Sequence, residues 1–286
     1  MKPKILVIGA TGNVGSEVVK ILLEQGQSVI AAVRDPAKAR RTLGDGPVYL
    51  PFDFKQPESF AAAFAGIDKV FLVRPPDISD IKKYVAPAID AARYAGVEQI
   101  VFLSLLGVEK NRVVPHYKIE QSLLTSGIDW TFLRASFFMQ NLNTTHLDNI
   151  KNRHDVFVPA GKGKTSFIDV RDIAAVAAKT LIESGHRRQA YDLTGKEALD
   201  YYQIARDFSE VLARPVQYSE PSALKFGREM YRRKLPLSFI IVMLGIYTTA
   251  RLGLAARVAP DTARLLGRDP ISLRQYIEDY KQVWLA

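Results

Sequence analysis

Three glycines near the start of the chain constrain its fold more than any other feature. Gly9, Gly12 and Gly15 stand at the spacing GxxGxxG. They follow the apolar run Lys4–Ile8 and precede the helical apolar spacing of Val14–Leu23. Glycine permits a tight strand exit, a close backbone approach to a ligand and close helix packing, and a helix start attracts phosphate. The pattern predicts a dinucleotide-binding strand–turn–helix unit, against the alternative of a purely structural turn.

Short apolar runs alternate with helical patterns over the first half of the chain. This rhythm predicts a parallel sheet with helices on both faces, and the uninterrupted apolar runs are typical of strands covered on both sides. The expected class is therefore α/β, a Rossmann doubly wound parallel sheet whose ligands bind beyond the carboxyl ends of the strands. The predicted strands are Lys4–Gly9, Ser28–Val33, Val48–Phe52, Lys69–Val73, Gln99–Ser104 and Trp130–Arg134, and the predicted helices are Val14–Leu23, Ser59–Phe64, Ile81–Ala95 and Tyr117–Thr125.

The second half of the chain is more helical. We expect residues 1–135 to form the Rossmann core, with a returning segment near residues 155–195, and residues 136–286 to form a smaller, mostly helical cap for the substrate. The predicted elements there are the helices Ile173–Ile182, Tyr202–Leu212 and Leu273–Trp284, and the short strands Asp155–Val158 and Ala190–Leu193.

The composition restricts the chemistry. With 286 residues, 48% of them hydrophobic, the chain can bury a substantial core. It has no cysteine, so disulfides, thiolate metal ligands and a cysteine nucleophile are excluded, and its four histidines lack metal-site spacing. The first residues lack the pattern of a signal peptide, and we expect a cytoplasmic protein.

Two further segments bear on partners. The net charge is +9, and basic residues cluster at Arg228, Arg232, Arg233 and Lys234 without a nucleic-acid-binding motif. We therefore expect a solvated helix face and no nucleic acid partner. The uncharged run Leu235–Ala250 is too short to span a bilayer core of roughly 30 Å. We expect a buried helix or lid there rather than a membrane span, with membrane association as the alternative.

The residues after the second predicted strand distinguish between dinucleotides. NAD sites place an acid at this position to hold the ribose 2′-hydroxyl, but this chain has Arg34, with Lys38 one helical turn further. Both cations suit a 2′-phosphate, so the expected cofactor is NADP(H). The alternative makes Arg34 a surface residue and Asp35 the acid. Asp53, after the third strand, is expected to accept from the adenine amino group, or else to be an ordinary turn aspartate.

With these segments in view, the sequence resembles the NmrA-like branch of the atypical short-chain dehydrogenases/reductases over nearly its whole length. The resemblance implies either an NADPH-dependent reductase of quinone-, enone- or dye-like molecules or a non-catalytic NADP(H) sensor that regulates a protein partner. The order and spacing of several segments carry it: GATGNVG at Gly9–Gly15, VRDPAK at Val33–Lys38, Asp53-Phe54, VFLVRPP at Val70–Pro76, FLSLLGV at Phe102–Val108, HYKIE at His116–Glu120, SGIDWTFLRASFFMQN at Ser126–Asn141, FIDVRDIA at Phe167–Ala174 and YDLTG at Tyr191–Gly195.

The motifs and the resemblance together give an expected cofactor-binding set that follows the ends of five strands. Ser104 stands where the family's triad serine would lie, although an ordinary strand-end serine is the alternative. The expected set is Gly9, Thr11, Gly12, Asn13, Val14, Gly15, Arg34, Lys38, Asp53, Phe54, Val73, Arg74 and Ser104.

The usual catalytic pair of short-chain dehydrogenases is absent, because none of the 12 tyrosines has a lysine four residues later. His116 and Glu120 are four apart on one helical face, as in the quinone-reductase-like members that the chain resembles. We expect His116 to hydrogen-bond the nicotinamide or substrate, or to relay a proton, while Glu120 orients its ring. The alternative is a structural His–Glu pair.

An aromatic run with two amides, Phe137–Asn141, follows the sixth predicted strand. It suits a flat, conjugated substrate, with Phe138 and Asn141 as the expected contacts, although plain core is the alternative. The expected partners are a small-molecule substrate and either a second copy of the chain in a homodimer or a regulatory protein.

Overall fold

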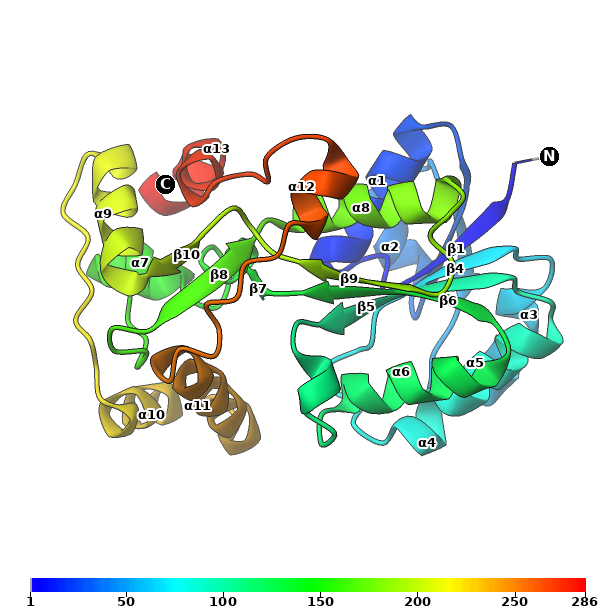
Figure 1. The fold of residues 1–286 in the computed structure, drawn as a ribbon, viewed down its shortest axis with the longest axis horizontal. Helices are drawn as coiled ribbons and strands as arrows, with labels where there is room; N and C mark the ends of the chain where they lie inside the picture. The colour runs from blue at the N-terminus through cyan, green and yellow to red at the C-terminus, as the bar shows by residue number, and fades with distance from the viewer. Residues whose placement is uncertain (1) are drawn as a thin grey trace. The chain divides into compact units, whose positions relative to one another are not determined.

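A computed structural model describes residues 2–286, which divide into two compact units (Figure 1). The first unit runs to Ala135 and includes Val170–Leu193 and Arg264–Leu266. The second unit comprises Ser136–Asp169, Thr194–Ala263 and Gly267–Ala286. The chain returns to the first unit at Val170, later than the sequence indicated, because residues 155–169 belong to the second unit.

The first unit is built on a seven-stranded parallel sheet with the order β3-β2-β1-β4-β5-β6-β9, which confirms the α/β Rossmann class. All seven of its strands were predicted from the sequence, to within a residue at each end. The strands are β1 (Lys4–Ile8), β2 (Ser28–Val33), β3 (Val48–Pro51), β4 (Lys69–Leu72), β5 (Gln99–Leu105), β6 (Asp129–Ala135) and β9 (Gln189–Leu193).

Helices cover both faces of this sheet, with α1, α2 and α8 on one side and α3, α5 and α6 on the other (Figure 1). The single helix predicted over Ile81–Ala95 is two helices, because Pro87 has no N–H to continue the hydrogen-bond ladder across the junction. The helices are α1 (Asn13–Glu24), α2 (Pro36–Leu43), η1 (Pro57–Ser59), α3 (Phe60–Phe64), α4 (Ile81–Tyr84), α5 (Ala86–Tyr94), η2 (Val108–Lys110), α6 (Pro115–Ser126) and α8 (Val170–Ile182).

The strand order reverses between β1 and β4. From β1 the chain moves outward through β2 to β3, and it then crosses back to place β4 on the other side of β1. In doubly wound sheets the crevice at such a switch point, beyond the carboxyl ends of the strands, is where ligands bind. Here that crevice begins at Gly9, after β1, and at Val73, after β4.

The second unit is mostly helical, as predicted, and it also contains a three-stranded sheet of order β10-β8-β7, whose strands the sequence did not indicate. The predicted strand Asp155–Val158 is wrong, because Asp155 forms one isolated bridge to Gln217 and no ladder follows. The elements are β7 (Phe137–Phe138), η3 (Met139–Asn141), α7 (Leu147–Arg153), β8 (Lys164–Ile168), β10 (Ala198–Asp200), α9 (Tyr201–Leu212), α10 (Ala223–Arg232), α11 (Leu237–Arg251) and α13 (Leu273–Leu285), while α12 (Asp261–Leu266) lies across the division between the units.

The uncharged run at residues 235–250 forms α11, which is buried on one side only. Ile240, Met243 and Tyr247 lie in the hydrophobic core of the second unit. Leu237 and Ile241 on the outward side are 63% and 60% exposed, so the prediction of a buried helix is half wrong. Throughout residues 2–286, α11 included, no helix combines the length and the apolar character that crossing a bilayer requires.

Candidate functional site

The glycine turn between β1 and α1 requires glycine at its first and last positions. Gly9 has a φ of +84°, and a Cβ there would lie 2.9 Å from Cβ of Val73. A Cβ on Gly15 would lie 2.1 Å from the carbonyl oxygen of Gly9, far inside van der Waals contact. The two glycines therefore let β1 turn sharply into α1 and let the helix sit directly against the turn.

The start of α1 is open. Gly12 is the N-cap residue and provides no side-chain cap, and the first turn of the helix has no acidic residue. The first intrahelical bond runs from N of Ser16 to O of Gly12 at 2.9 Å, so the N–H groups of Asn13 and Val14 precede the ladder. A Cβ on Gly12 would meet one neighbouring atom, O of Gly9 at 3.3 Å. This end of the helix can therefore receive a phosphate group.

A cleft of about 290 Å³ in the first unit joins this turn to the residues that follow β2, β3 and β4. Eight members of the sequence-predicted set line it: Gly9, Thr11, Gly12, Arg34, Asp53, Phe54, Val73 and Arg74. Asn13, Val14, Gly15, Lys38 and Ser104 do not appear among its lining residues. Lys55 and Asp77, which the sequence did not single out, line the cleft and form an ion pair at 2.8 Å.

Arg34 directly follows β2 and is exposed at the cleft. Within the part of the chain that the structure describes, its guanidinium has no hydrogen bond or ion pair. The neighbouring Asp35 is already in use, since its Oδ1 accepts the backbone N–H of Lys38 at 3.0 Å and caps α2. The arrangement therefore favours Arg34 as an anion ligand over the alternative in which Asp35 binds a ribose hydroxyl.

Arg74 lines the same cleft but is committed to the protein. Its Nη1 donates to the carbonyl oxygens of Pro75 at 2.7 Å, Pro76 at 3.2 Å and Ile78 at 2.6 Å. Burial lowers the pKa of the guanidinium. Arg74 thus holds the loop after β4 in place and adds positive charge to the wall.

Asp53 and Phe54 follow the end of β3. Oδ1 of Asp53 accepts the backbone N–H of Lys55 at 2.9 Å, as in a turn aspartate, and no hydrogen bond is formed by Oδ2 within residues 2–286. The ring of Phe54 is 3% exposed and packs edge-on against Phe52 at 4.9 Å. Asp53 can therefore still accept a hydrogen bond from a ligand, while Phe54 contributes mainly to the core.

His116 lies in the first turn of α6 with its ring stacked on Phe102, at a centroid distance of 5.9 Å and an interplanar angle of 26°. Its Nδ1 is buried and has no hydrogen-bond partner among the described residues. Burial, with a smaller contribution from the charge of Arg74, lowers the pKa of His116 to about 4. The imidazole is therefore neutral at pH 7.

Glu120 does not orient His116, which corrects the sequence prediction. Glu120 is 2% exposed, and its carboxylate accepts a hydrogen bond from Oγ of Ser104 at 2.6 Å. The carboxylate also accepts hydrogen bonds from Nε of Arg134 at 3.1 Å and from Nη2 at 2.8 Å. Glu120 lies one turn after His116 on the same face of α6, but its carboxylate oxygens accept hydrogen bonds from Ser104 at the end of β5 and from Arg134 at the end of β6.

The same network corrects the prediction that Ser104 binds the cofactor, because its buried hydroxyl donates to Glu120. Sequence reasoning missed Arg134, although a signal existed. Ser104 and Arg134 end two consecutive predicted strands, and they are direct partners in the β5–β6 register. Arg134 further lies 3.5 Å from Glu109. A buried carboxylate with a bidentate arginine ties α6 to two strands of the sheet.

The predicted substrate residues Phe138 and Asn141 belong to the second unit, where β7 and η3 position them. Both are half-buried. Between them, Gln140 is buried and donates to Oδ1 of Asp169 at 3.0 Å, which fixes this corner to the end of β8. Phe138 and Asn141 remain predicted substrate contacts.

Comparison with known proteins places this geometry among reductases. A family model described as the NmrA-like family matches residues 1–246. The chain is 36% identical to an NAD(P)H azoreductase of Xenophilus azovorans over 268 residues, which are 92% of this chain and 93% of the relative. Its structure resembles that of Citrobacter triphenylmethane reductase complexed with NADP(H), with a TM-score of 0.85, 27% identity and coverage of 96% and 99% of the two chains.

A second solved structure is similar to the same extent. It is an NADPH-dependent quinone oxidoreductase of Escherichia coli complexed with NADPH, with a TM-score of 0.88, 25% identity and coverage of 97% and 99% of the two chains. The azoreductase, the dye reductase and the quinone reductase share a nicotinamide dinucleotide and differ in the acceptor that they are named for.

Proposed function

The chain belongs to the NmrA-like family, and we propose that it is an NADPH-dependent reductase of quinone-, enone- or dye-like small molecules. One observation carries the proposal. The open start of α1 and the unpaired guanidinium of Arg34 line a single cleft. The similarity to azo, quinone and triphenylmethane reductases supports the reaction class.

The residues of the cleft fit the charged parts of NADPH. We propose that the turn from Gly9 to Gly15 binds the pyrophosphate through backbone N–H groups and the helix dipole. Arg34 binds the 2′-phosphate, because its planar fork of donors matches phosphate and is unused by the protein. Lys38 adds charge beside it, and Asp53 accepts from the adenine amino group through Oδ2. Bound NADPH would supply the hydride to the acceptor.

His116 has a polar but uncharged role in this proposal. With its pKa lowered to about 4, it is not an imidazolium acid at pH 7, and it acts instead as a neutral hydrogen-bond partner of the nicotinamide amide or of the acceptor. Glu120, Ser104 and Arg134 are positioning residues, since they hold the helix that carries His116. Phe138 and Asn141 are proposed to contact the acceptor. The proton needed by the reduced product comes from water.

The test is to mix the purified chain with NADPH and a panel of benzoquinones, naphthoquinones, azo dyes and triphenylmethane dyes, and to follow the absorbance of the reduced nicotinamide. We expect acceptor-dependent oxidation of NADPH, and slower oxidation of NADH at equal concentration. Titration calorimetry measures the affinity for each dinucleotide in parallel. Tight NADPH binding without turnover of any acceptor would falsify the reductase proposal while leaving the cofactor site intact.

The alternative function, a non-catalytic NADP(H) sensor, is less well supported, because the relatives reported above are named as reductases. Residence in the cytoplasm and assembly with a second copy or a regulatory protein stay predictions.

A further inference from the structure

Helix α11 presents an apolar surface outward, where a surface helix normally carries polar side chains. No charged residue occurs between Leu235 and Ala250. The exposed apolar side chains of this helix and of the turn after it, called the α11 face below, are those of Leu237, Phe239, Ile241, Val242, Ile246, Leu252 and Leu254. Several exposed apolar side chains on one helix and the turn after it are typical of an interaction surface.

The chain around the α11 face is strongly basic. Between Pro221 and Pro260 there are seven lysines and arginines and a single acid, Glu229. A surface of this charge attracts polyanions or anionic lipid headgroups.

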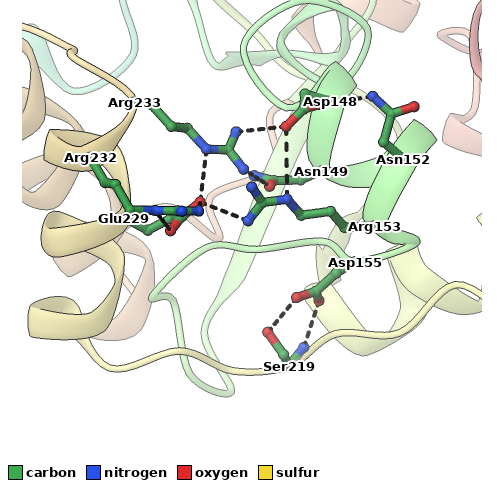
Figure 2. Close-up of polar contacts among 9 residues, drawn as sticks. All are labelled: Asp148, Asn149, Asn152, Arg153, Asp155, Ser219, Glu229, Arg232 and Arg233. Atoms are coloured by element: carbon green, nitrogen blue, oxygen red, sulfur yellow. Dashed lines mark hydrogen bonds and ion pairs between the residues drawn. The ribbon is translucent and has the colours of Figure 1, made fainter.

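The single acid is neutralised inside the second unit, as Figure 2 shows. The carboxylate of Glu229 forms ion pairs with Arg153 at 2.7 Å, Arg232 at 3.0 Å and Arg233 at 3.1 Å. Arg233 also pairs with Asp148 at 3.2 Å. Hydrogen bonds from Arg232 first, and then from Arg153 and Arg233, lower the pKa of Glu229 to about 2. Arg233 and Arg153 therefore join the end of α10 to α7, whereas Arg232 is 69% exposed and pairs only with Glu229 of its own helix. Of the four cations predicted on a solvated face, only Arg233 is partly buried.

Four other cations stay free. Lys225, Arg228, Lys234 and Arg251 are exposed, and their side chains form no hydrogen bond or ion pair with any residue from 2 to 286. Arg228 and Lys234 precede α11, while Arg251 is its last residue. Unpaired positive charge thus stands in sequence at both ends of the α11 face.

We propose that the α11 face docks the protein on the surface of an anionic lipid bilayer. The helix has 15 residues and is too short to span, so it lies in the plane of the headgroups. Its outward side chains would enter the boundary between headgroups and acyl chains, to a depth of roughly 5–10 Å. The free cations then lie at the level of the lipid phosphates, where each lysine or arginine strengthens binding about fivefold.

Charge decides between a bilayer and a second copy of the chain. A symmetric contact through the α11 face would bring two basic surfaces together, and like charges oppose such a pair. An anionic bilayer offers an apolar interior and negative charge at once, which matches both properties of the face. This proposal does not depend on the reductase activity.

Co-sedimentation with vesicles tests the proposal on the full chain. We expect binding to phosphatidylglycerol-containing vesicles, little binding to pure phosphatidylcholine vesicles, and release as salt is raised. The double variant Ile241→Asp, Val242→Asp should lower the partition coefficient at least about tenfold, because two apolar side chains no longer enter the bilayer. Lys234→Gln should lower it about fivefold.

The matched control is Leu285→Asp, which changes a 46% exposed leucine on α13 of the same unit and should leave vesicle binding unchanged. Circular dichroism and the unfolding temperature of each variant report folding. The proposal is overturned if the unmodified chain does not bind anionic vesicles at low salt, or if the double variant binds them as well as the unmodified chain does. Two other results also overturn it, if the unmodified chain does not bind vesicles. In the first, the unmodified chain is a dimer by analytical ultracentrifugation and the double variant is a monomer. In the second, the double variant has a higher KM for water-soluble acceptors.

Discussion

The end of β2 and the adjoining ends of β5 and β6 lie on the same sheet, yet their charged side chains are used in opposite ways. After β2, Arg34 is exposed and has no partner within the described chain, while Asp35 is spent on a helix cap. At the ends of β5 and β6, Arg134 is paired bidentately with Glu120 of α6, and Ser104 completes the network. The protein leaves a cation free where a phosphate is proposed to bind, and it satisfies the charges where a helix must be held.

This contrast separates binding residues from positioning residues. An unpaired cation at a cleft gains its hydrogen bonds when a ligand arrives, so its removal should weaken binding and spare the fold. A buried ion pair already has its hydrogen bonds, so removal of one partner should weaken the fold. His116 stands apart from both, because it is buried and neutral.

The largest effect is expected for Glu120→Ala. It leaves the guanidinium of Arg134 without its buried partner, and such a loss typically costs about 3–5 kcal/mol of unfolding free energy. Urea unfolding measures the change, and titration with NADPH under folding conditions should show a much smaller change in affinity. If the variant keeps its stability but loses affinity for NADPH, Glu120 is a cofactor-binding residue rather than a positioning residue.

Glu109→Gln is the matched control for that prediction. Glu109 lies 3.5 Å from the same arginine, but its side chain is 36% exposed. Removing an exposed pair of this kind should change stability by no more than about 1 kcal/mol.

The next effect, counted for each residue, is a loss of stability in mild acid. Burial lowers the pKa of His116 and of His146 from 6.5 to about 4, and His146 is held against Tyr247. The unfolded chain takes up these protons at higher pH than the folded chain does. Stability is therefore full above pH 6.5 and falls between pH 6.5 and about 4, by about 3 kcal/mol for each histidine.

Chemical denaturation between pH 7 and pH 4.5 measures this slope. In His116→Gln the slope should fall by about 1.4 kcal/mol per pH unit, because one proton-linked group is gone. A slope equal to that of the unmodified chain would show that His116 titrates normally in the folded state, and would return it to consideration as an imidazolium acid.

The smallest effect in free energy, and the most selective, is expected for Arg34→Ala. Loss of charge-assisted hydrogen bonds to the 2′-phosphate should weaken NADPH by about 1.5–3 kcal/mol, or roughly 10- to 150-fold, and should leave NADH affinity and stability nearly unchanged. Arg41→Ala is the control, because Arg41 is an exposed cation on α2, the helix that begins two residues after Arg34, and lies outside the cleft lining. Equal losses for both dinucleotides would show that the 2′-phosphate is read elsewhere.

The first unit could be predicted closely because its strands carry an uninterrupted apolar signal. In the second unit the helices α9 and α13 were predicted to within a residue at each end. Its strands could not be predicted, because they are short and their partners are distant in sequence. β8 pairs with β10 some 30 residues later and with the two-residue β7 before it. Residues 155–158 show the converse case, in which an apolar segment is buried without finding a ladder.

The candidate site divides in the same manner. The spacing GxxGxxG and the arginine after β2 are local features, and both lie where the sequence indicated. The partners of Glu120 are not local, because Ser104 and Arg134 come from neighbouring strands that the helix spacing cannot reveal. The exposure of α11 is likewise a result of packing, since its apolar residues point both inward and outward.

By itself, the sequence determined the doubly wound sheet, the turn at Gly9–Gly15 and the cation at Arg34, because each depends on backbone conformation or on position along one strand. The tertiary structure decided which polar groups are satisfied by the protein and which stay free. That distinction depends on burial and on contacts between distant segments. It turned Glu120 from an expected partner of His116 into a partner of Arg134, and it left Arg34 available to a ligand.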